Sequence, residues 1–147
     1  MKKTILLLCL AVLFTSSCSS SKNSPGGNSL SSIMQVLNAR WALQSIAGQT
    51  GLGDLFGEQM PFLQFDTQAS RVSGNNGCNS LAGPLKIEAG NKISFANMVS
   101  TRKACPGQGE SVFMNALNKV TNFKVDNGVL KLLNQGEEVM SFIKGDN

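Results

Sequence analysis

Cysteine side chains carry most of the reactive chemistry available to this 147-residue chain, which contains neither histidine nor tyrosine. The four cysteines are Cys9, Cys18, Cys78 and Cys105. A zinc site needs about four nitrogen or sulfur ligands, and a dithiol redox centre usually has the spacing Cys-x-x-Cys. The sequence meets neither condition, which disfavours metal and redox chemistry. Acylation, disulfide formation and burial as free thiols remain as roles for these side chains.

Catalysis by other side chains is also poorly supported. The nine carboxylates are scattered over turns and polar strand positions. Glu137 and Glu138 are adjacent, and in a strand they would point to opposite faces, so they cannot form a close catalytic pair. We therefore assign no catalytic residue and expect a protein that is not an enzyme and needs no cofactor.

Residues 1–17 have the parts of a secretory signal peptide. Lys2 and Lys3 precede an apolar run from Ile5 to Phe14, and small residues follow. An apolar core of about ten residues is too short to span a bilayer. The sequence therefore predicts export and removal of this segment.

The cleavage region Thr15-Ser16-Ser17-Cys18 resembles the lipobox of bacterial lipoproteins, although Thr15 stands where an aliphatic residue is usual. An ordinary signal peptidase site is the alternative, because Thr15 and Ser17 are small. Lipidation accounts for the cysteine count: Cys9 leaves with the signal, and acylation of Cys18 leaves one pair. We expect a lipid anchor at Cys18 and a place in the bacterial cell envelope. By analogy with enterobacterial sorting, Ser19 suggests the outer membrane, on its periplasmic face or at the cell surface.

Composition divides the rest of the chain into a tether and one domain. Residues 18–35 are rich in serine and glycine and are expected to form a tether, in which the segment 19–32 would be flexible with a typical span of roughly 20 Å. Residues 36–147 have the length of a single folded domain. The net charge of +4 includes Lys2 and Lys3, and the other charges are scattered, so nucleic-acid binding is not expected.

Hydrophobic periodicity predicts an α+β fold. Period-two alternation, as in residues 85–88 and 123–125, predicts short antiparallel strands, and Asp126-Asn127-Gly128 is a hairpin signal. One segment has helical periodicity, with apolar residues at positions i, i+3, i+4 and i+7. These residues are Phe113, Ala116, Leu117 and Val120. The helix precedes three closing strands.

Three segments together resemble the META domain, or HslJ-like, family. They are Trp41–Gly48, Gly77-Cys78-Asn79 with Gly83 following, and Thr101-Arg102-Lys103-Ala104-Cys105-Pro106. The resemblance implies a curled, cracked-barrel-like antiparallel sheet of about seven or eight strands, with one helix inserted before the last three. The motif residues that it singles out are Gly77, Asn79, Gly83, Thr101, Arg102 and Pro106. Lys103 and Leu85 depart from the family pattern, where an apolar and an aromatic residue are frequent.

Export favours a disulfide between Cys78 and Cys105, which would contribute on the order of 3–4 kcal/mol in the chain-entropy model. Free buried thiols are the main alternative. Arg102 is expected to pair with a carboxylate or backbone carbonyls, and less readily with an anionic ligand. Trp41 is expected in the core.

The function expected from these features is that of an envelope lipoprotein that supports envelope maintenance or stress resistance by binding a partner or ligand. Two alternatives remain open. A curled sheet can enclose a lipid or other small apolar molecule, although small barrels are usually filled by side chains. The implied fold is also similar to that of pilotins, lipoproteins that assist outer-membrane secretins, although fold alone is a weak guide to function.

Overall fold

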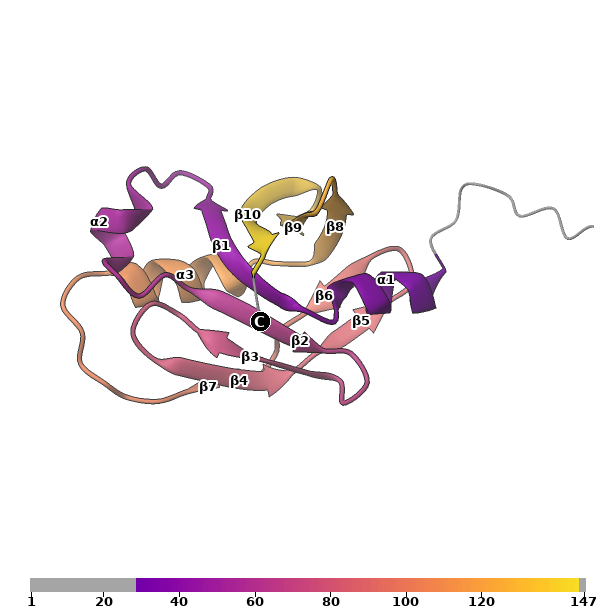
Figure 1. The fold of residues 1–147 in the computed structure, drawn as a ribbon, viewed down its shortest axis with the longest axis horizontal. Coiled ribbons are helices and arrows are strands. Elements are labelled where there is room, and N and C mark those ends of the chain that lie inside the picture. The colour runs from indigo at the N-terminus through magenta and orange to yellow at the C-terminus, as the bar shows by residue number, and fades with distance from the viewer. Residues whose placement is uncertain (1–28, 146–147) are drawn as a thin grey trace, which may run out of the picture.

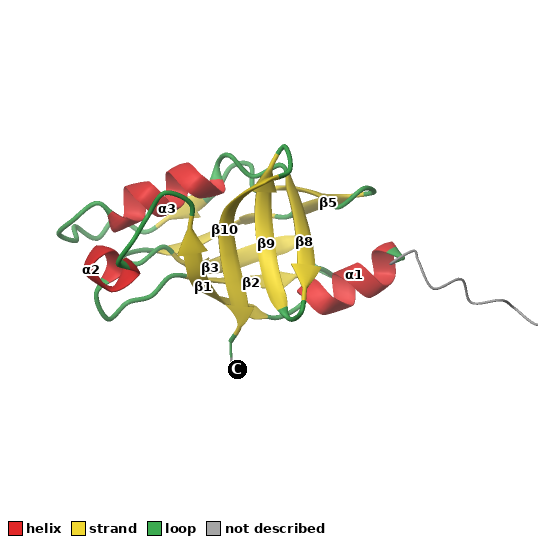
Figure 2. Cartoon of the chain, turned by 90° about the horizontal axis from the view of Figure 1, so that it is seen from above, coloured by secondary structure: helices red, strands yellow, loops and turns green. Residues whose placement is uncertain are grey.

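The structure, a computed structural model, describes residues 29–145, which form one ten-stranded antiparallel sheet with three helices (Figures 1 and 2). The helices are α1 (Leu30–Leu37), α2 (Leu52–Phe56) and α3 (Gly109–Leu117). The strands are β1 (Arg40–Ile46), β2 (Phe62–Asp66), β3 (Arg71–Asn75), β4 (Ser80–Pro84), β5 (Lys86–Glu88), β6 (Lys92–Ser94), β7 (Val99–Ser100), β8 (Asn122–Asp126), β9 (Val129–Asn134) and β10 (Glu137–Lys144). The predicted signal peptide and Cys18 lie outside the described residues.

The sheet has the strand order β5-β6-β8-β9-β10-β1-β2-β3-β4-β7. The first and last strands of the domain, β1 and β10, therefore pair at its centre. The register shifts once between β1 and β10, at Leu43/Ser45, and once between β10 and β9, at Glu138/Met140. The predicted hairpin is present: Asp126 pairs with Val129 across a turn in which Asn127 and Gly128 both have positive φ. Such two-residue turns match the right-handed twist of the strands that they join.

The predicted α+β fold with a helix before the last three strands is confirmed. α3 lies between β7 and β8 in the chain and packs against β10, and it shares one end of the sheet with α2 (Figures 1 and 2). Its apolar side is buried, and the Phe113 ring meets the Phe142 ring of β10 edge-on, with 6.5 Å between centroids. Such pairs add a directional attraction to the burial of apolar surface.

Large apolar side chains fill the inside of the curled sheet. Trp41 is 1% exposed, as predicted, and its indole N–H donates to the carbonyl oxygen of Leu37 at 3.0 Å. The buried residues form one connected cluster that spans the sheet and α3. Six phenylalanines belong to it: Phe56, Phe65, Phe95, Phe113, Phe123 and Phe142. The inner side chains of the sheet thus pack against one another.

The sheet has ten strands where the family resemblance implied seven or eight. The pattern did not reveal β3, β4 and β7. β3 and β4 each bury one large apolar residue, Val72 and Leu81, so their alternation is weak. β7 has only two residues, both exposed, and is defined by its pairing with β4. Backbone pairing, which leaves little trace in a sequence, forms these strands.

The folded domain includes residues that precede its predicted boundary at residue 36. Ser29 caps α1 by accepting the Ser32 N–H, and Leu37 at the end of the helix is fully buried. Thr67, in the turn after β2, donates its hydroxyl proton to the carbonyl oxygen of Met34 at 3.3 Å. The last third of the predicted tether is thus a helix packed on the domain. None of the helices in residues 29–145 is long and apolar enough to cross a membrane.

Replacing Phe113 with alanine tests how far α3 depends on this core. Phe113→Ala removes a fully buried ring, and we expect a loss of about 3–5 kcal/mol in the free energy of unfolding. Val99→Ala is the control, because Val99 is 67% exposed and should change stability by less than about 0.5 kcal/mol. Urea unfolding measures both. Similar midpoints for the two variants would contradict this description of the core.

Candidate functional site

A tight turn between β3 and β4 organises the segment that contains Cys78. The Asn76 side chain is fully buried, and its Oδ1 accepts the backbone N–H groups of Cys78 at 3.2 Å and Asn79 at 2.7 Å. Gly77 adopts a φ of +94°, which side chains rarely tolerate, and a methyl group there would collide with the Phe56 ring. Glycine is therefore required at position 77 by both its backbone conformation and its contact with α2.

The Asn79 side chain, 1% exposed, uses its whole hydrogen-bonding capacity. Its Oδ1 accepts the Thr101 hydroxyl at 2.8 Å and the Lys103 N–H at 2.7 Å. Its Nδ2 donates to the Lys103 carbonyl oxygen at 3.2 Å and to Glu110 Oε2 at 2.9 Å. An amide has two donor protons and two acceptor sites, and all are engaged here. Asn79 therefore ties the β3–β4 turn to the loop after β7 and to α3.

Glu110 completes this network from the first turn of α3. Its Oε1 accepts from Asn76 Nδ2 at 3.0 Å, while its Oε2 accepts from Asn79. A carboxylate in the first turn of a helix also interacts favourably with the helix dipole. Both carboxylate oxygens thus hold the start of α3 against the turn.

The structure joins Cys78 to Cys105 in a disulfide, as the cysteine count favoured, with 5.9 Å between their Cα atoms. The two halves differ in exposure: Cys78 is 3% exposed, whereas Cys105 lies in the exposed stretch from residue 101 to 108. Asn79 Nδ2 lies 3.3 Å from Cys78 Sγ. The covalent bond and the Asn79 network therefore hold the same loop at neighbouring points.

An open cleft of about 730 Å³, here called the disulfide cleft, lies beside this bond. It is lined by residues 54–59, 77–78, 103–107 and 109–111. α2 and α3 approach closely on one side, and a methyl group at position 109 would lie 2.5 Å from the Leu55 carbonyl oxygen. The lining carries the carboxylates of Asp54, Glu58 and Glu110 and the ammonium group of Lys103. The cleft therefore combines apolar lining with charged groups that carry an excess of negative charge.

The motif residues fall into three groups. Gly77, Asn79 and Thr101 meet at the network, and Pro106 joins Gly77 in the lining of the disulfide cleft. Gly83 lies apart from them on β4, against Met98. Arg102 is exposed and has no ion pair among the described residues, so the expected carboxylate partner is not found there. Lys103 is exposed, and it contributes its backbone to the network.

Sequence reasoning missed two members of the network, Asn76 and Glu110. Asn76 looks like one of several turn-forming asparagines, and Glu110 like an ordinary first-turn acid. Their roles depend on contacts across 34 and 31 positions of sequence. The only available signal was the position of Glu110, a few residues after Cys105-Pro106, and this position did not indicate that Asn76 and Asn79 are its partners.

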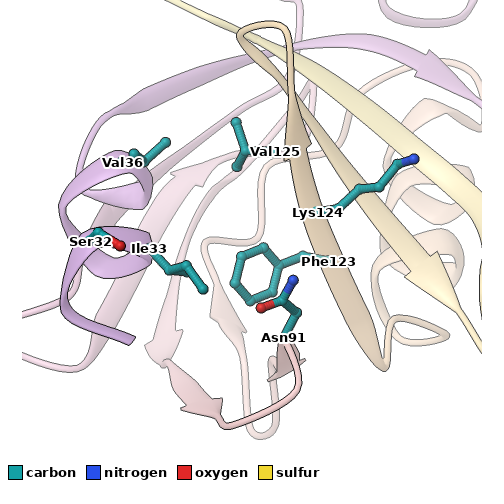
Figure 3. Close-up of a pocket in the computed structure, with 7 residues that line it drawn as sticks. All are labelled: Ser32, Ile33, Val36, Asn91, Phe123, Lys124 and Val125. Atoms are coloured by element: carbon teal, nitrogen blue, oxygen red, sulfur yellow. The ribbon is translucent and has the colours of Figure 1, made fainter. Parts of the chain in front are cut away.

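A second cleft, the α1 cleft, has a volume of about 320 Å³ between α1 and β8 (Figure 3). Ile33 and Val36 of α1 line one side, and Phe123 and Val125 of β8 line the other. In Figure 3 the Phe123 ring points toward Ile33, while Lys124 points away from them, as expected from alternation along a strand. Four of its seven lining residues are apolar, and Ser32, Asn91 and Lys124 complete the lining.

The ion pairs found in residues 29–145, Lys86–Glu88 and Lys131–Glu138, lie outside both clefts. The hydrogen bond and the charge of Lys86, 3.0 Å away, lower the pKa of Glu88, but this exposed pair lies on the β5–β6 hairpin and lines neither cleft. Residues 29–145 contain no cluster of three histidine, cysteine or carboxylate side chains suited to a metal ion. The polar network described above is instead a structural linkage.

These features define a small α+β domain in which a curled sheet surrounds a filled apolar core and carries a disulfide-closed polar network at one end. The sequence profile of the META domain matches residues 34–147, and the chain belongs to the META domain family. The resemblance read from the cysteine segments is thereby confirmed.

Solved structures with under 25% identity support the fold alone. A protein from Burkholderia xenovorans, solved by NMR, has 20% identity and a TM-score of 0.60, with 100% of both chains covered. A second NMR structure has 18% identity and a TM-score of 0.58, covering 75% of this chain and 92% of the other. A DUF4847 family protein from Bacteroides vulgatus has 15% identity and a TM-score of 0.52, with 76% and 96% covered. No curated protein sequence matches the chain.

Replacing Asn79 with alanine tests the network. The change leaves the Glu110 carboxylate and the Lys103 backbone without their partner, and each buried polar group so orphaned costs about 1–3 kcal/mol. We therefore expect Asn79→Ala to lower the free energy of unfolding by at least about 2 kcal/mol in urea titration, with the disulfide intact.

Asn115→Ala is the matched control, because Asn115 is exposed in the middle of α3, where alanine is the better helix former. It should change stability by no more than about 0.5 kcal/mol. Glu110→Gln is a second test of the same contacts. The side-chain NH2 group of the new glutamine would face the Nδ2 donor of Asn76 or Asn79, so one of the two hydrogen bonds would be lost. Full stability in both Asn79→Ala and Glu110→Gln would contradict the assigned network.

Proposed function

We propose that this protein is a lipid-anchored protein of the bacterial envelope that acts by binding a partner protein at the disulfide cleft, in envelope maintenance or stress resistance. The observation that carries the proposal is the contrast between an interior filled by side chains and an open cleft with excess negative charge beside the family motif. Gly77, Cys78, Cys105 and Pro106 all line that cleft.

The shape of the cleft supports a macromolecular partner. Its walls come from α2, the β3–β4 turn and the loop before α3, and the disulfide and the Asn79 network fix the last two relative to each other. A pre-organised surface binds without a large ordering cost. The carboxylates of Asp54 and Glu58 favour a partner segment that carries positive charge.

The N-terminal sequence supports the envelope location. Acylation at Cys18 would contribute about 0.8 kcal/mol for each buried CH₂ group, enough for stable anchoring when several chains are attached. α1 begins at Leu30, within the segment that composition assigned to the tether, which leaves residues 19–29 between Cys18 and the helix. A linker of that length would span less than the roughly 20 Å expected for the longer tether, so the domain would remain close to the lipid surface.

A small apolar ligand is the second candidate, and the α1 cleft is the observation that favours it. Its apolar walls, Ile33, Val36 and Val125, suit an aliphatic chain or ring (Figure 3). Its volume of about 320 Å³ is at the lower end of the range for small-molecule pockets. A carrier role would use this surface cleft, because large side chains occupy the interior of the sheet.

Mass spectrometry of the protein purified from the membranes of a Gram-negative host tests the proposed location. We expect a chain that begins at Cys18 and carries the added mass of acyl groups, while Cys18→Ser should move to the soluble fraction without that mass. An unmodified wild-type chain in the soluble fraction would contradict the anchor. A molecule that is released only on denaturation would favour the carrier.

Site-specific photo-crosslinking in living cells tests the proposed surface. A photoreactive residue at Glu58, exposed at the disulfide cleft, should yield one dominant cross-linked protein. The control is Gln68, exposed in the turn after β2. Adding Lys103→Glu, which enlarges the negative charge of the cleft, should change the yield at Glu58 and leave Gln68 unaffected. Equal cross-linking from both positions would argue against the cleft as the binding surface.

A further inference from the structure

We infer that the Cys78–Cys105 disulfide is a site of thiol exchange, attacked at Cys105 by a cationic thiol and leaving Cys78 as the thiolate. The incoming thiolate forms a bond to Cys105 Sγ, and the electron pair of the broken S–S bond goes to Cys78 Sγ, which then takes a proton from water. The reverse attack by Cys78 on the mixed disulfide restores the original bond. The exchange involves no net oxidation. One S–S bond replaces another, and Cys78 becomes a thiol while the incoming thiol becomes part of the mixed disulfide.

Exposure makes the two sulfur atoms unequal as targets. Both cysteines line the disulfide cleft, but Cys78, within the β3–β4 turn, is only 3% exposed, whereas Cys105 lies in the exposed loop. A thiolate must approach the sulfur that it attacks, so access decides which half of a disulfide reacts. We therefore expect the incoming thiolate to enter through the cleft and to attack Cys105 Sγ.

The sulfur that leaves is already placed beside suitable partners. Asn79 Nδ2 lies 3.3 Å from Cys78 Sγ, and because its two protons also donate to Lys103 and Glu110, the departing thiolate would share one of them in a bifurcated contact. The Lys103 carbonyl oxygen lies 3.5 Å from the same sulfur and can accept the S–H proton once the thiolate is protonated. Cys105, in the exposed loop, has no such polar contact among the described residues.

Opening the bond would release only a short part of the chain. Asn79 holds Thr101 and Lys103 on one side of Cys105, and Asn76 and Asn79 hold Glu110 on the other. The residues between these anchor points, 104–109, include only one that is buried, Gly109. Exchange would therefore loosen one wall of the disulfide cleft without removing the contacts that hold α3 to the sheet.

The charge around Cys105 selects among thiols. The cleft contains the carboxylates of Asp54, Glu58 and Glu110 and the ammonium group of Lys103, so an incoming cation is favoured and an anion opposed. This effect should weaken as salt shortens the range of the field. The ratio of the exchange rate with the cationic thiol cysteamine to that with the anionic thiol glutathione should therefore be higher for this protein than for an exposed peptide disulfide.

Peptide mapping after partial reaction tests where exchange occurs. The exported chain carrying Cys18→Ser is treated with limiting cysteamine, quenched with acid, alkylated and digested. We expect cysteamine on Cys105 and the alkyl group on Cys78, in about tenfold excess over the reverse arrangement, because access directs the attack. An even distribution, cysteamine mainly on Cys78, or a disulfide that resists cysteamine under conditions that open the peptide disulfide would overturn the inference.

Two single variants separate accessibility from instability. Cys78→Ser and Cys105→Ser both lack the disulfide, so both lose its contribution to stability. Under native conditions Cys105 in the first should react with an aromatic disulfide reagent about 100-fold faster than Cys78 in the second, and the rates should converge in urea. Equal native rates would overturn the inference.

Replacing Glu58 with glutamine tests the charge selectivity. Glu58 is exposed, and Glu58→Gln should lower the preference of the disulfide for cysteamine over glutathione; an unchanged preference would refute the charge selectivity.

Discussion

The buried side-chain amide of Asn79 is the contact on which this end of the domain depends. It meets Thr101 and Lys103 with its oxygen, and Lys103 and Glu110 with its nitrogen. Aspartate would present acceptors where the Lys103 carbonyl and the Glu110 carboxylate need donors, and leucine would leave every partner unsatisfied. Only an amide of this length supplies both kinds of atom, so the position is specified by hydrogen-bond chemistry rather than by volume.

The disulfide and the network reinforce each other in different ways. The covalent bond limits the unfolded chain by closing a loop with a sequence separation of 27, whereas the network acts only in the folded state, where its groups are desolvated. Their overlap at Cys78, Asn79 and Lys103 explains how a loop made almost entirely of exposed residues is held beside a helix. The network also positions α3, whose Phe113 then completes the core under the sheet.

Local signals in the sequence were sufficient for the helix α3, the hairpin at Asn127-Gly128 and the burial of Trp41, because periodicity and turn chemistry act over a few residues. They were not sufficient for β3 and β4, each with one large buried apolar residue, or for the two-residue β7. α1 was also missed, since its polar face continues the serine-rich composition before it although Leu37 is fully buried. In the site, the Cys78–Cys105 pair followed from counting cysteines, but the role of Glu110 arises from contacts across more than thirty positions, which no local pattern contains.

The apolar core and the Asn79 network constrain the sequence in different ways, and this difference limits what the family motif indicates about function. The core requires only apolar residues in the right pattern and of about the right total volume, so many different sequences can build it. Solved structures that share only 15–20% identity with this chain accordingly have a similar fold. The residues that reveal the family, such as Gly77, Asn79 and Thr101, have a full structural explanation in the turn and the network. Their presence therefore does not specify a ligand. Selectivity for any partner in the disulfide cleft has to come from lining residues outside the network, such as Asp54, Glu58 and Ser111, which are exposed.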